Sequence, residues 1–462
     1  MMDLIIKGGT IVTASDQYVG DIGVEGGVIS QIAQSLPANG ARVIEAAGLY
    51  VIPGAIDAHT HLDMPFGGTV TSDDFETGQI AAACGGTTTH VDYCLQSVGG
   101  TLHAALDTWK AKAVGKAVID YGFHLAVTDL TPSVMNELPA MVELGITSFK
   151  CFMAYKGVFQ IDDATLFQVL EQARELGVLV NVHAENGDVV DLLIHRYVNE
   201  GLVTPRYHAA SRPPEVEAEA THRAVALAEL ARAPLNVVHM THEGSVRHVA
   251  EARARGATHI HGETCPQYLL LNVDQYDEPD FQGARYVMSP PLRQAKEHEY
   301  LWRQLASGTL QTLMTDHCSF RMADQKTLGK DNFAKIPNGI PGIETRVPIV
   351  FSEGVGRGHI SLQTMVATMC TNPARMYGLY PRKGCLAVGS DADIVLIDPK
   401  KRVILRAETL NQHTDYCPYE GLEVTGYPVL TISRGEVIAE NGKYVGAPAR
   451  GRFLHRGPYQ AP

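Results

Sequence analysis

The sequence predicts an α/β protein: an eight-stranded (β/α)8 TIM barrel with a small β-sandwich domain built from both chain termini. Three observations support this fold. Eight short apolar strand patterns recur between residues 51 and 316, helical patterns separate them, and alternating apolar stretches with glycine turns lie before and after this region. Repeated strand and helix units favour a parallel sheet, so the middle of the chain is expected to close into a barrel whose strands end at one common face.

Residues 1–53 are predicted to form the N-terminal part of the β-sandwich. Apolar and polar residues alternate over Leu4–Lys7, Gly9–Val12, Tyr18–Val24 and Val28–Ile32, with glycine turns between the runs. A period of two with short glycine turns is typical of antiparallel strands.

Residues 54–380 are predicted to form the barrel. Helical patterns such as Ala164–Leu176 and the alanine-rich Glu215–Ala231 alternate with the strands. An open doubly wound sheet is the competing interpretation, but it calls for a Gly-x-Gly-x-x-Gly loop after the first strand, and the sequence has none there. The predicted barrel strands are Val51–Asp57, Thr87–Tyr93, Tyr121–Val127, Thr147–Met153, Val178–His183, Leu235–Met240, Thr258–Thr264 and Thr312–Asp316.

Residues 381–440 are predicted to complete the β-sandwich, with strand patterns at Ala392–Pro399 and Val429–Ile438. Residues 441–462 are rich in Gly, Pro and Arg. They predict a C-terminal tail that is loose alone or ordered at a subunit interface.

Composition narrows the class of protein. Of the 462 residues, 45% are apolar and 19% charged, and no stretch approaches the ~18 uninterrupted apolar residues of a membrane span. The net charge of −13 comes without a basic block, so nucleic acid is not an expected partner. The N-terminus lacks a signal-peptide pattern, and the eight cysteines form no Cys-x-x-Cys pair. We therefore expect a cytoplasmic protein with no membrane or nucleic-acid partner.

Two histidines at the end of the first barrel strand, His59 and His61, predict a metal site. Positions i and i+2 of a strand share one face, and neutral imidazole is a common metal ligand. In a chain with 19 histidines this pair alone is weak evidence, because ordinary buried histidines explain it equally well. The interpretation gains strength from polar residues at four other strand ends, which would converge on one mouth of the barrel. They are Lys150, His183, His239 and Asp316.

Lys150 stands in an apolar strand beside these residues. Burial lowers the pKa of a lysine and makes its amine nucleophilic. Such an amine can take up carbon dioxide to give a carbamate that bridges two metal ions, as in a two-metal hydrolase. A Schiff base is the alternative role, which the four surrounding histidines disfavour.

Motifs along nearly the whole chain closely resemble the hydantoinase and dihydropyrimidinase group of the cyclic amidohydrolases, in the urease-related amidohydrolase superfamily. This resemblance implies a zinc-dependent hydrolase that opens hydantoins or dihydropyrimidines to N-carbamoyl amino acids. The motifs are Asp57–Pro65, Ser148–Lys156, Gly262–Leu269, Met288–Arg293, Asp316–Cys318, Asn338–Glu344, Asn372–Arg375 and Gly389–Val395.

By this resemblance the chain holds two Zn2+ ions, with Mn2+, Co2+ or Fe2+ as alternatives. The residues implied for one ion are His59, His61, Asp316 and Lys150 as N6-carboxylysine. Those implied for the other are Lys150, His183 and His239.

The resemblance also implies a mechanism, in which a hydroxide that bridges the two ions attacks the ring amide carbonyl. Asp316 would pass the proton of the hydroxide to the leaving ring nitrogen. The second zinc and the Tyr155 hydroxyl would stabilise the oxyanion. Main-chain groups of Ser289 and Asn338 would bind the amide edge of the ring, although both residues also fit ordinary turns.

The expected substrate is a small neutral cyclic diamide. Dihydroorotases place an arginine two positions after the second histidine to pair with a substrate carboxylate, whereas this chain has Asp63 there. The loops supply apolar residues for a bulky or aromatic 5-substituent, whose identity and hand the sequence leaves open. The candidates are Met64, Phe66, Leu95, Phe152 and Phe159.

Two alternatives to this function are an allantoinase-like hydrolase and a non-catalytic scaffold on the same fold. The scaffold is disfavoured because all six ligand positions and Tyr155 are present. The family further implies a homotetramer, with a dimer as the alternative.

Overall fold

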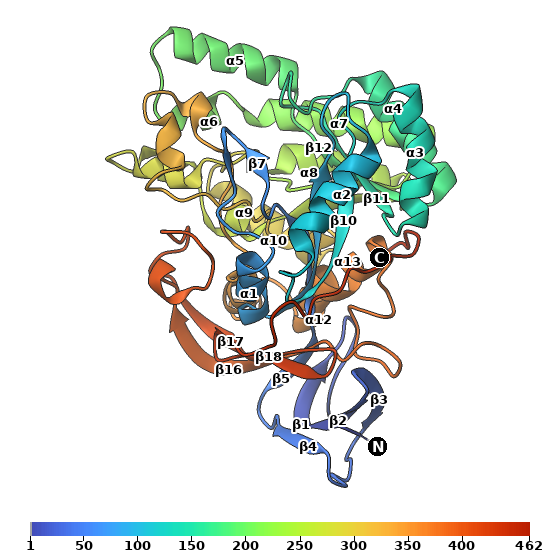
Figure 1. Ribbon diagram of the computed structural model, residues 1–462. Helices are drawn as coiled ribbons and strands as arrows, with labels where there is room; N and C mark the ends of the chain where they lie inside the picture. The colour runs from blue at the N-terminus through green and yellow to red at the C-terminus, as the bar shows by residue number, and fades with distance from the viewer. Residues whose placement is uncertain (1) are drawn as a thin grey trace.

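The computed structural model describes residues 2–462, and in it eight parallel strands form the barrel sheet (Figure 1). The strands lie side by side in the order in which they occur along the chain. Each predicted barrel strand has a counterpart, and the (β/α)8 prediction is confirmed. The strands are β6 (Ala55–Thr60), β9 (Thr87–Leu95), β10 (Asp120–Ala126), β11 (Ser148–Phe152), β12 (Leu179–His183), β13 (Leu235–Val237), β14 (Ile260–Thr264) and β15 (Thr312–Leu313).

The barrel closes where β6 meets the segment that follows β15. Thr60 pairs in parallel with His317, and the His61 amide donates to the His317 carbonyl at 2.8 Å. This closure brings the end of the first strand next to the end of the last one. His59 of β6 and His61 just after it therefore come to lie beside Asp316.

Helices cover the outside of the barrel, and their ends follow sequence signals. In α4 the Asp162 side chain caps the N-terminus by accepting from the Thr165 amide at 2.8 Å, and Gly177 ends the helix with a left-handed φ of 67°. Among residues 2–462, no helix has both the length and the apolar content needed to cross a membrane. The longer helices are α1 (Thr77–Cys84), α2 (Leu102–Ala113), α3 (Pro132–Glu143), α4 (Asp163–Leu176), α5 (Gly187–Asn199), α7 (Pro214–Ala231), α8 (Glu243–Ala254) and α10 (Lys296–Ala306).

Short helical segments connect these elements. A two-stranded hairpin follows the first barrel strand along the chain. The short α-helices are α6 (Arg206–Ala210), α9 (Pro266–Leu270), α11 (Arg346–Ile349), α12 (Leu362–Val366) and α13 (Asn372–Met376). The 3-10 segments are η1 (Val273–Asp277), η2 (Gln282–Tyr286), η3 (Lys326–Gly329), η4 (Phe333–Lys335) and η7 (Ala407–Thr409), and the π-helical ones are η5 (Val350–Val355) and η6 (Ala367–Thr371). The hairpin strands are β7 (Pro65–Phe66) and β8 (Thr69–Val70).

Both chain termini build one nine-stranded sheet, as predicted for the accessory β domain. Its first strands, blue in Figure 1, lie beside its last strands, red, because β5 pairs antiparallel with β16. The sheet is mixed, since β1 also pairs in parallel with β4 and β5. Its strands are β1 (Leu4–Val12), β2 (Gln17–Glu25), β3 (Val28–Ala33), β4 (Arg42–Glu45), β5 (Tyr50–Pro53), β16 (Ile394–Ile404), β17 (Glu423–Ser433), β18 (Glu436–Glu440) and β19 (Lys443–Tyr444).

The predicted first barrel strand, Val51–Asp57, is two strands in the structure. Its first residues belong to β5 in the terminal sheet, and the barrel begins with β6. Gly54 separates them, and a Cβ there would lie 2.1 Å from Thr88 Oγ1. Only glycine fits this close approach, so the apolar run changes sheets at Gly54.

The C-terminal tail is ordered against the chain's own barrel. Main-chain hydrogen bonds join Tyr121 of β10 to Arg452 at 3.0 Å and to Leu454 at 2.7 Å, and the buried Arg456 side chain donates to the Phe123 carbonyl. The sequence shows no local partner for this tail because the groups that hold it lie far away along the chain.

Candidate metal centre and active site

Two imidazoles and one carboxylate converge where β6 and β15 end. His59 and His61 are almost fully buried, and each places Nε2 close to Asp316 Oδ1, at 3.2 Å and 3.1 Å. The His59 and His61 ring centroids are 5.4 Å apart. Three predicted ligands thus point at one small volume.

A second pair of imidazoles lies beside the first. His183 ends β12 and His239 follows β13, and His183 Nδ1 is 2.9 Å from His239 Nε2. The rings of His59 and His239 are 5.4 Å apart, which joins the two pairs into one cluster. Donor atoms of His59, His239 and Asp316 lie within 4.8 Å of one another, as a metal site requires.

Lys150 belongs to the same cluster but forms no direct salt bridge among residues 2–462. Its side chain is 1% exposed in β11, and its Nζ is 5.0 Å from the ring centroids of Tyr93 and Phe152. Among residues 2–462, no carboxylate lies within ion-pairing distance of this Nζ. Burial lowers the pKa of Lys150 to about 8, although Asp316 and Glu263 act to raise it, so about a tenth of the amine is neutral at about pH 7.

Charge state at the cluster favours metal binding. Burial lowers the pKa of His59 and His239 well below the ordinary value, so their rings are neutral and keep a free lone pair. Burial acts to raise the pKa of Asp316, but His59 and His61 outweigh it and lower that pKa. Neutral imidazoles and an ionised carboxylate are the forms that coordinate metal ions.

Two buried carboxylates that sequence analysis did not assign to the site hold the histidines. Glu263 Oε1 is 2.6 Å from His59 Nδ1, and Glu185 Oε2 is 2.8 Å from His183 Nε2. Metal-binding histidines commonly have their second nitrogen bound by a carboxylate, which fixes ring orientation. The donor set therefore fits a metal centre. Two features of the sequence could have indicated these residues. Glu263 lies inside a predicted strand, and Glu185 follows the candidate ligand His183 by two residues.

The predicted substrate residues lie beside the same cluster. The Tyr155 ring is 5.2 Å from the His183 ring, and Asn338 Nδ2 donates to Ser289 Oγ at 3.2 Å. Burial raises the pKa of Tyr155, so its hydroxyl remains a hydrogen-bond donor. The structure thus brings all three residues to the cavity that the cluster lines.

Three residues of the site adopt a left-handed backbone. The φ angles are 67° at Tyr155, 42° at His239 and 53° at Asp316. For residues other than glycine this conformation costs about 1–3 kcal/mol each, and it persists only where the surroundings enforce it. Such strain commonly accompanies pre-organised functional sites.

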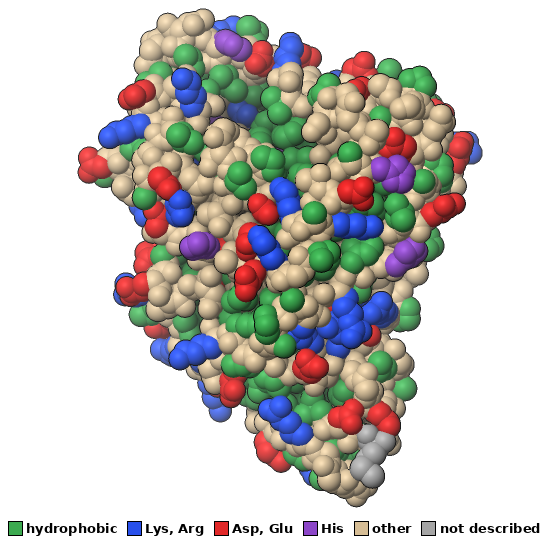
Figure 2. Space-filling view, in the orientation of Figure 1, with side chains coloured by type: hydrophobic (Ala, Val, Ile, Leu, Met, Phe, Trp, Pro, Cys, Tyr) green, Lys and Arg blue, Asp and Glu red, His purple; other side chains and the backbone are tan. Residues whose placement is uncertain are grey.

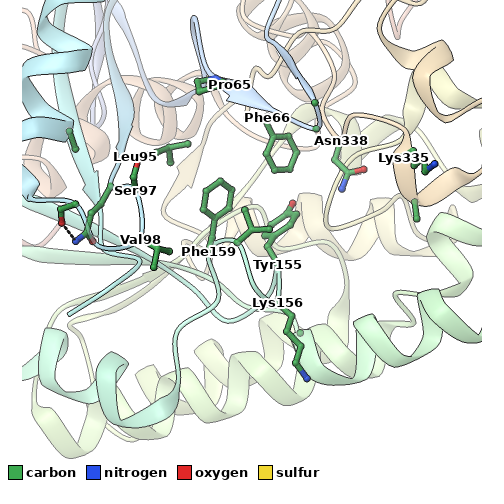
Figure 3. A pocket seen from close by; sticks show the side chains of 18 of the residues that line it. Pro65, Phe66, Leu95, Ser97, Val98, Tyr155, Lys156, Phe159, Lys335 and Asn338 are labelled. Atoms are coloured by element: carbon green, nitrogen blue, oxygen red, sulfur yellow. Dashed lines mark hydrogen bonds between the residues drawn. The ribbon is translucent and has the colours of Figure 1, made fainter. Parts of the chain in front are cut away.

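A larger cavity of about 1060 Å3 opens next to the metal cluster (Figure 3). Figure 2, in the orientation of Figure 1, shows hydrophobic side chains in a hollow between α5 and α2. The rings of Phe66, Phe159 and Tyr155 face one another at the junction of the two cavities, with centroids 5.6–6.0 Å apart. The cavity around the cluster is lined by all five predicted loop residues, which are Met64, Phe66, Leu95, Phe152 and Phe159.

The outer wall of the larger cavity consists of residues that were not predicted from the sequence. Trp109 of α2 and Val190 and Ile194 of α5 line it, together with Ile336. From the sequence alone, apolar helix residues at these positions are expected to belong to the hydrophobic core. Only the packing of the helices around the barrel shows which of them face the cavity.

Comparisons with known proteins agree with this geometry. The Amidohydrolase family profile matches residues 50–438. The chain is 53% identical to a D-hydantoinase of Geobacillus stearothermophilus, over 100% of this chain and 98% of the relative, and 48% identical to a D-hydantoinase of Ralstonia pickettii, over 99% and 100%. The crystal structure of a dihydropyrimidinase from Brevibacillus agri superposes with a TM-score of 0.98 at 52% identity and covers 99% of both chains.

Proposed function

The chain belongs to the amidohydrolase family and is a cyclic amide hydrolase, and we propose that it opens hydantoins and dihydropyrimidines to N-carbamoyl amino acids. One observation carries the proposal. Four imidazoles, Asp316 and an unpaired Lys150 converge at the ends of the barrel strands, beside a cavity large enough for a substituted ring.

We propose two Zn2+ ions as the cofactor, which Lys150 as N6-carboxylysine would help to hold. When bound, the ions would polarise the amide carbonyl and activate the attacking water. The glutamates on His59 and His183 support this assignment. The residues that would hold the first ion are His59, His61 and Asp316, and those for the second are His183 and His239.

Asp316 and Tyr155 are proposed to carry the catalytic steps of the protein itself. Asp316 is ionised and adjoins the ligand histidines, so it can accept the proton of the water and return it to the leaving ring nitrogen. Tyr155 keeps its proton and can donate a hydrogen bond to the oxyanion. The proton must move from the attacking water to the leaving ring nitrogen, and the Asp316 carboxylate beside the proposed metal site can carry it.

Substrate orientation is proposed to depend on main-chain groups of Ser289 and Asn338. A planar amide edge is well matched by fixed backbone amides and carbonyls, which cannot rotate away as side chains do. The 5-substituent would extend past Phe66 and Phe159 into the larger cavity, which favours bulky or aromatic groups. The similarity to D-hydantoinases supports the D hand.

Ring opening of dihydrouracil, hydantoin, a racemic 5-aryl hydantoin and allantoin by one zinc-loaded sample tests the function. We expect hydantoin, dihydrouracil and the aryl hydantoin to be opened, with N-carbamoyl-D-amino acid as the chiral product. Activity on allantoin alone would contradict the substrate proposal and favour the allantoinase-like alternative. In the control Asp316→Asn, turnover should fall about 10²- to 10⁴-fold because a carboxamide cannot carry the proton.

We further propose a cytoplasmic homotetramer, with a dimer as the alternative. The resemblance to the hydantoinase group supports the assembly, and the eight free cysteines agree with a reducing compartment. Size-exclusion chromatography with light scattering should give a mass of about four chains, and a 50.0 kDa monomer would contradict it.

A further inference from the structure

Lys326, the first residue of η3, is fully buried and takes no part in the metal cluster. Its Nζ donates to the carbonyl oxygens of Val287 at 2.8 Å, Pro337 at 2.7 Å and Gly339 at 2.7 Å. These three acceptors match the three N–H groups of an ammonium. Within residues 2–462 no carboxylate pairs with Lys326, and burial lowers its pKa to about 7. The three carbonyls, with the Phe320 ring centroid 5.7 Å from Nζ, are therefore the groups that stabilise its protonated form.

The three carbonyls belong to the two segments that carry the substrate-binding candidates. Val287 lies two residues before Ser289, and Pro337 and Gly339 flank Asn338. The Gly339 amide also donates to the Val287 carbonyl at 2.9 Å, which joins the segments directly. Lys326 therefore holds the backbone on both sides of Asn338 and just ahead of Ser289.

Asn338, between the held residues Pro337 and Gly339, lies at the cavity. Asn338 O is 3.6 Å from Cys318 Sγ, and both residues line the cavity around the metal cluster. Gly339 has a φ of 145°, and a Cβ there would lie 2.4 Å from the Cys318 carbonyl. No side chain at position 339 could brace this segment from within, so the bracing comes from Lys326.

Burying a lysine side chain costs more free energy than burying an apolar side chain of similar size. Removing an ammonium from water is costly, and an apolar side chain of similar length would fill the same space at lower cost. What an apolar side chain cannot do is turn three carbonyls from two segments toward one point. The charge is therefore explained by the orientation of the backbone it holds.

We propose that Lys326 is a positioning residue for substrate binding, which fixes the main chain around Ser289 and Asn338 to match the amide edge of a cyclic diamide. The inference rests on the proposed function, because it assigns these main-chain groups to the substrate.

The test compares Lys326→Met with Lys383→Met, a second buried lysine whose Nζ is 2.7 Å from Asp120 and Asp393, away from the cavity. For each metal-loaded protein, metal content, Tm, KM and kcat for hydantoin are measured. The inhibition constant of uracil is also measured, because its unsaturated ring presents the same amide edge. Lys326→Arg is the second variant, since it keeps the charge but presents a planar group of different reach.

We expect Lys326→Met to keep its metal while KM and the uracil inhibition constant both rise about tenfold or more, with a smaller change in kcat. Lys383→Met should lower Tm and leave KM unchanged. If Lys326→Met does not fold, the same rise in both constants is expected of Lys326→Arg. Folded Lys326 variants with a lower Tm but unchanged constants would overturn the inference and leave the proposed function standing. A metal-loaded wild type that opens none of the rings would overturn both.

Discussion

A buried lysine lies near each end of the barrel, and the two lysines differ in their electrostatic partners. At the junction with the terminal sheet, Lys383 Nζ lies 2.7 Å from Asp120 and Asp393 and 3.0 Å from Asp391. At the metal cluster, Lys150 Nζ is 5.0 Å from the ring centroids of Tyr93 and Phe152 and forms no ion pair among residues 2–462. A fully paired buried charge serves structure, whereas an unpaired one is retained for its chemistry.

Lys150→Ala tests the functional side of this comparison and should have the largest effect. We expect loss of bound metal and a fall in kcat/KM of at least about a thousandfold, because the proposed carbamate on Lys150 cannot form. Metal analysis and kinetics check this on one sample, and short carboxylic acids should restore part of both. A variant with full activity and full metal content would remove the bridging role.

Lys383→Met tests the structural side. Loss of the ammonium leaves three neighbouring carboxylates without their shared partner, so the free energy of unfolding should fall by about 3–5 kcal/mol. Denaturant unfolding of the metal-loaded protein measures this change. The kcat/KM of the folded fraction should stay the same. Reduced kcat/KM with unchanged stability would break the comparison, because it would give the paired lysine a functional role.

The sequence predicts the strands and the ligand positions well because both depend on local patterns. Apolar runs mark the barrel strands, and polar residues such as His59 and Lys150 are conspicuous at or near their ends. Closure of the barrel then places these residues together without further information.

Other features depend on contacts between distant parts of the chain. In the sequence Glu263 is not distinguished from other strand residues. Only the closed barrel places its Oε1 2.6 Å from His59 Nδ1. The wall that α2 and α5 contribute depends on helix packing. The tail is held by hydrogen bonds to residues far away along the chain, such as those to Tyr121 and Phe123. The change of sheet at Gly54 follows from one close approach to Thr88.

Glu263→Gln sharpens the comparison with a smaller change at the metal cluster. Burial raises the pKa of Glu263 to about 8. A carboxamide keeps the shape of the side chain but cannot ionise, so it cannot supply the carboxylate that would orient His59 and raise its basicity as a metal ligand. Metal affinity should fall about 10- to 100-fold, as measured by competition with a chelator. Glu344→Gln is the matched control, because that buried glutamate accepts from Asn411 away from the cluster. Equal metal affinities for the two variants would deny Glu263 its role.

The smallest effect concerns His261, a buried ionisable group outside the metal cluster, which lies 2.6 Å from the Tyr459 hydroxyl of the tail. Burial, with Arg253 nearby, lowers the pKa of His261 to about 3, whereas an unfolded histidine titrates near 6.5. The stabilisation is therefore present above about pH 6.5 and is lost as pH falls toward 3. At about pH 5 the loss is about 2 kcal/mol.

His261→Gln removes this titration but keeps a partner for Tyr459. Unfolding free energies measured between about pH 7.5 and about pH 5 should fall less steeply in the variant than in the wild type. His90, whose pKa burial also lowers to about 3, leaves the variant a residual slope of the same sign. The kcat/KM values of the two folded proteins should agree at each pH, since His261 does not line the cavity around the cluster. Identical stability slopes would show that His261 is not kept neutral by folding, and a difference in kcat/KM would extend the functional region of the barrel to the tail contact.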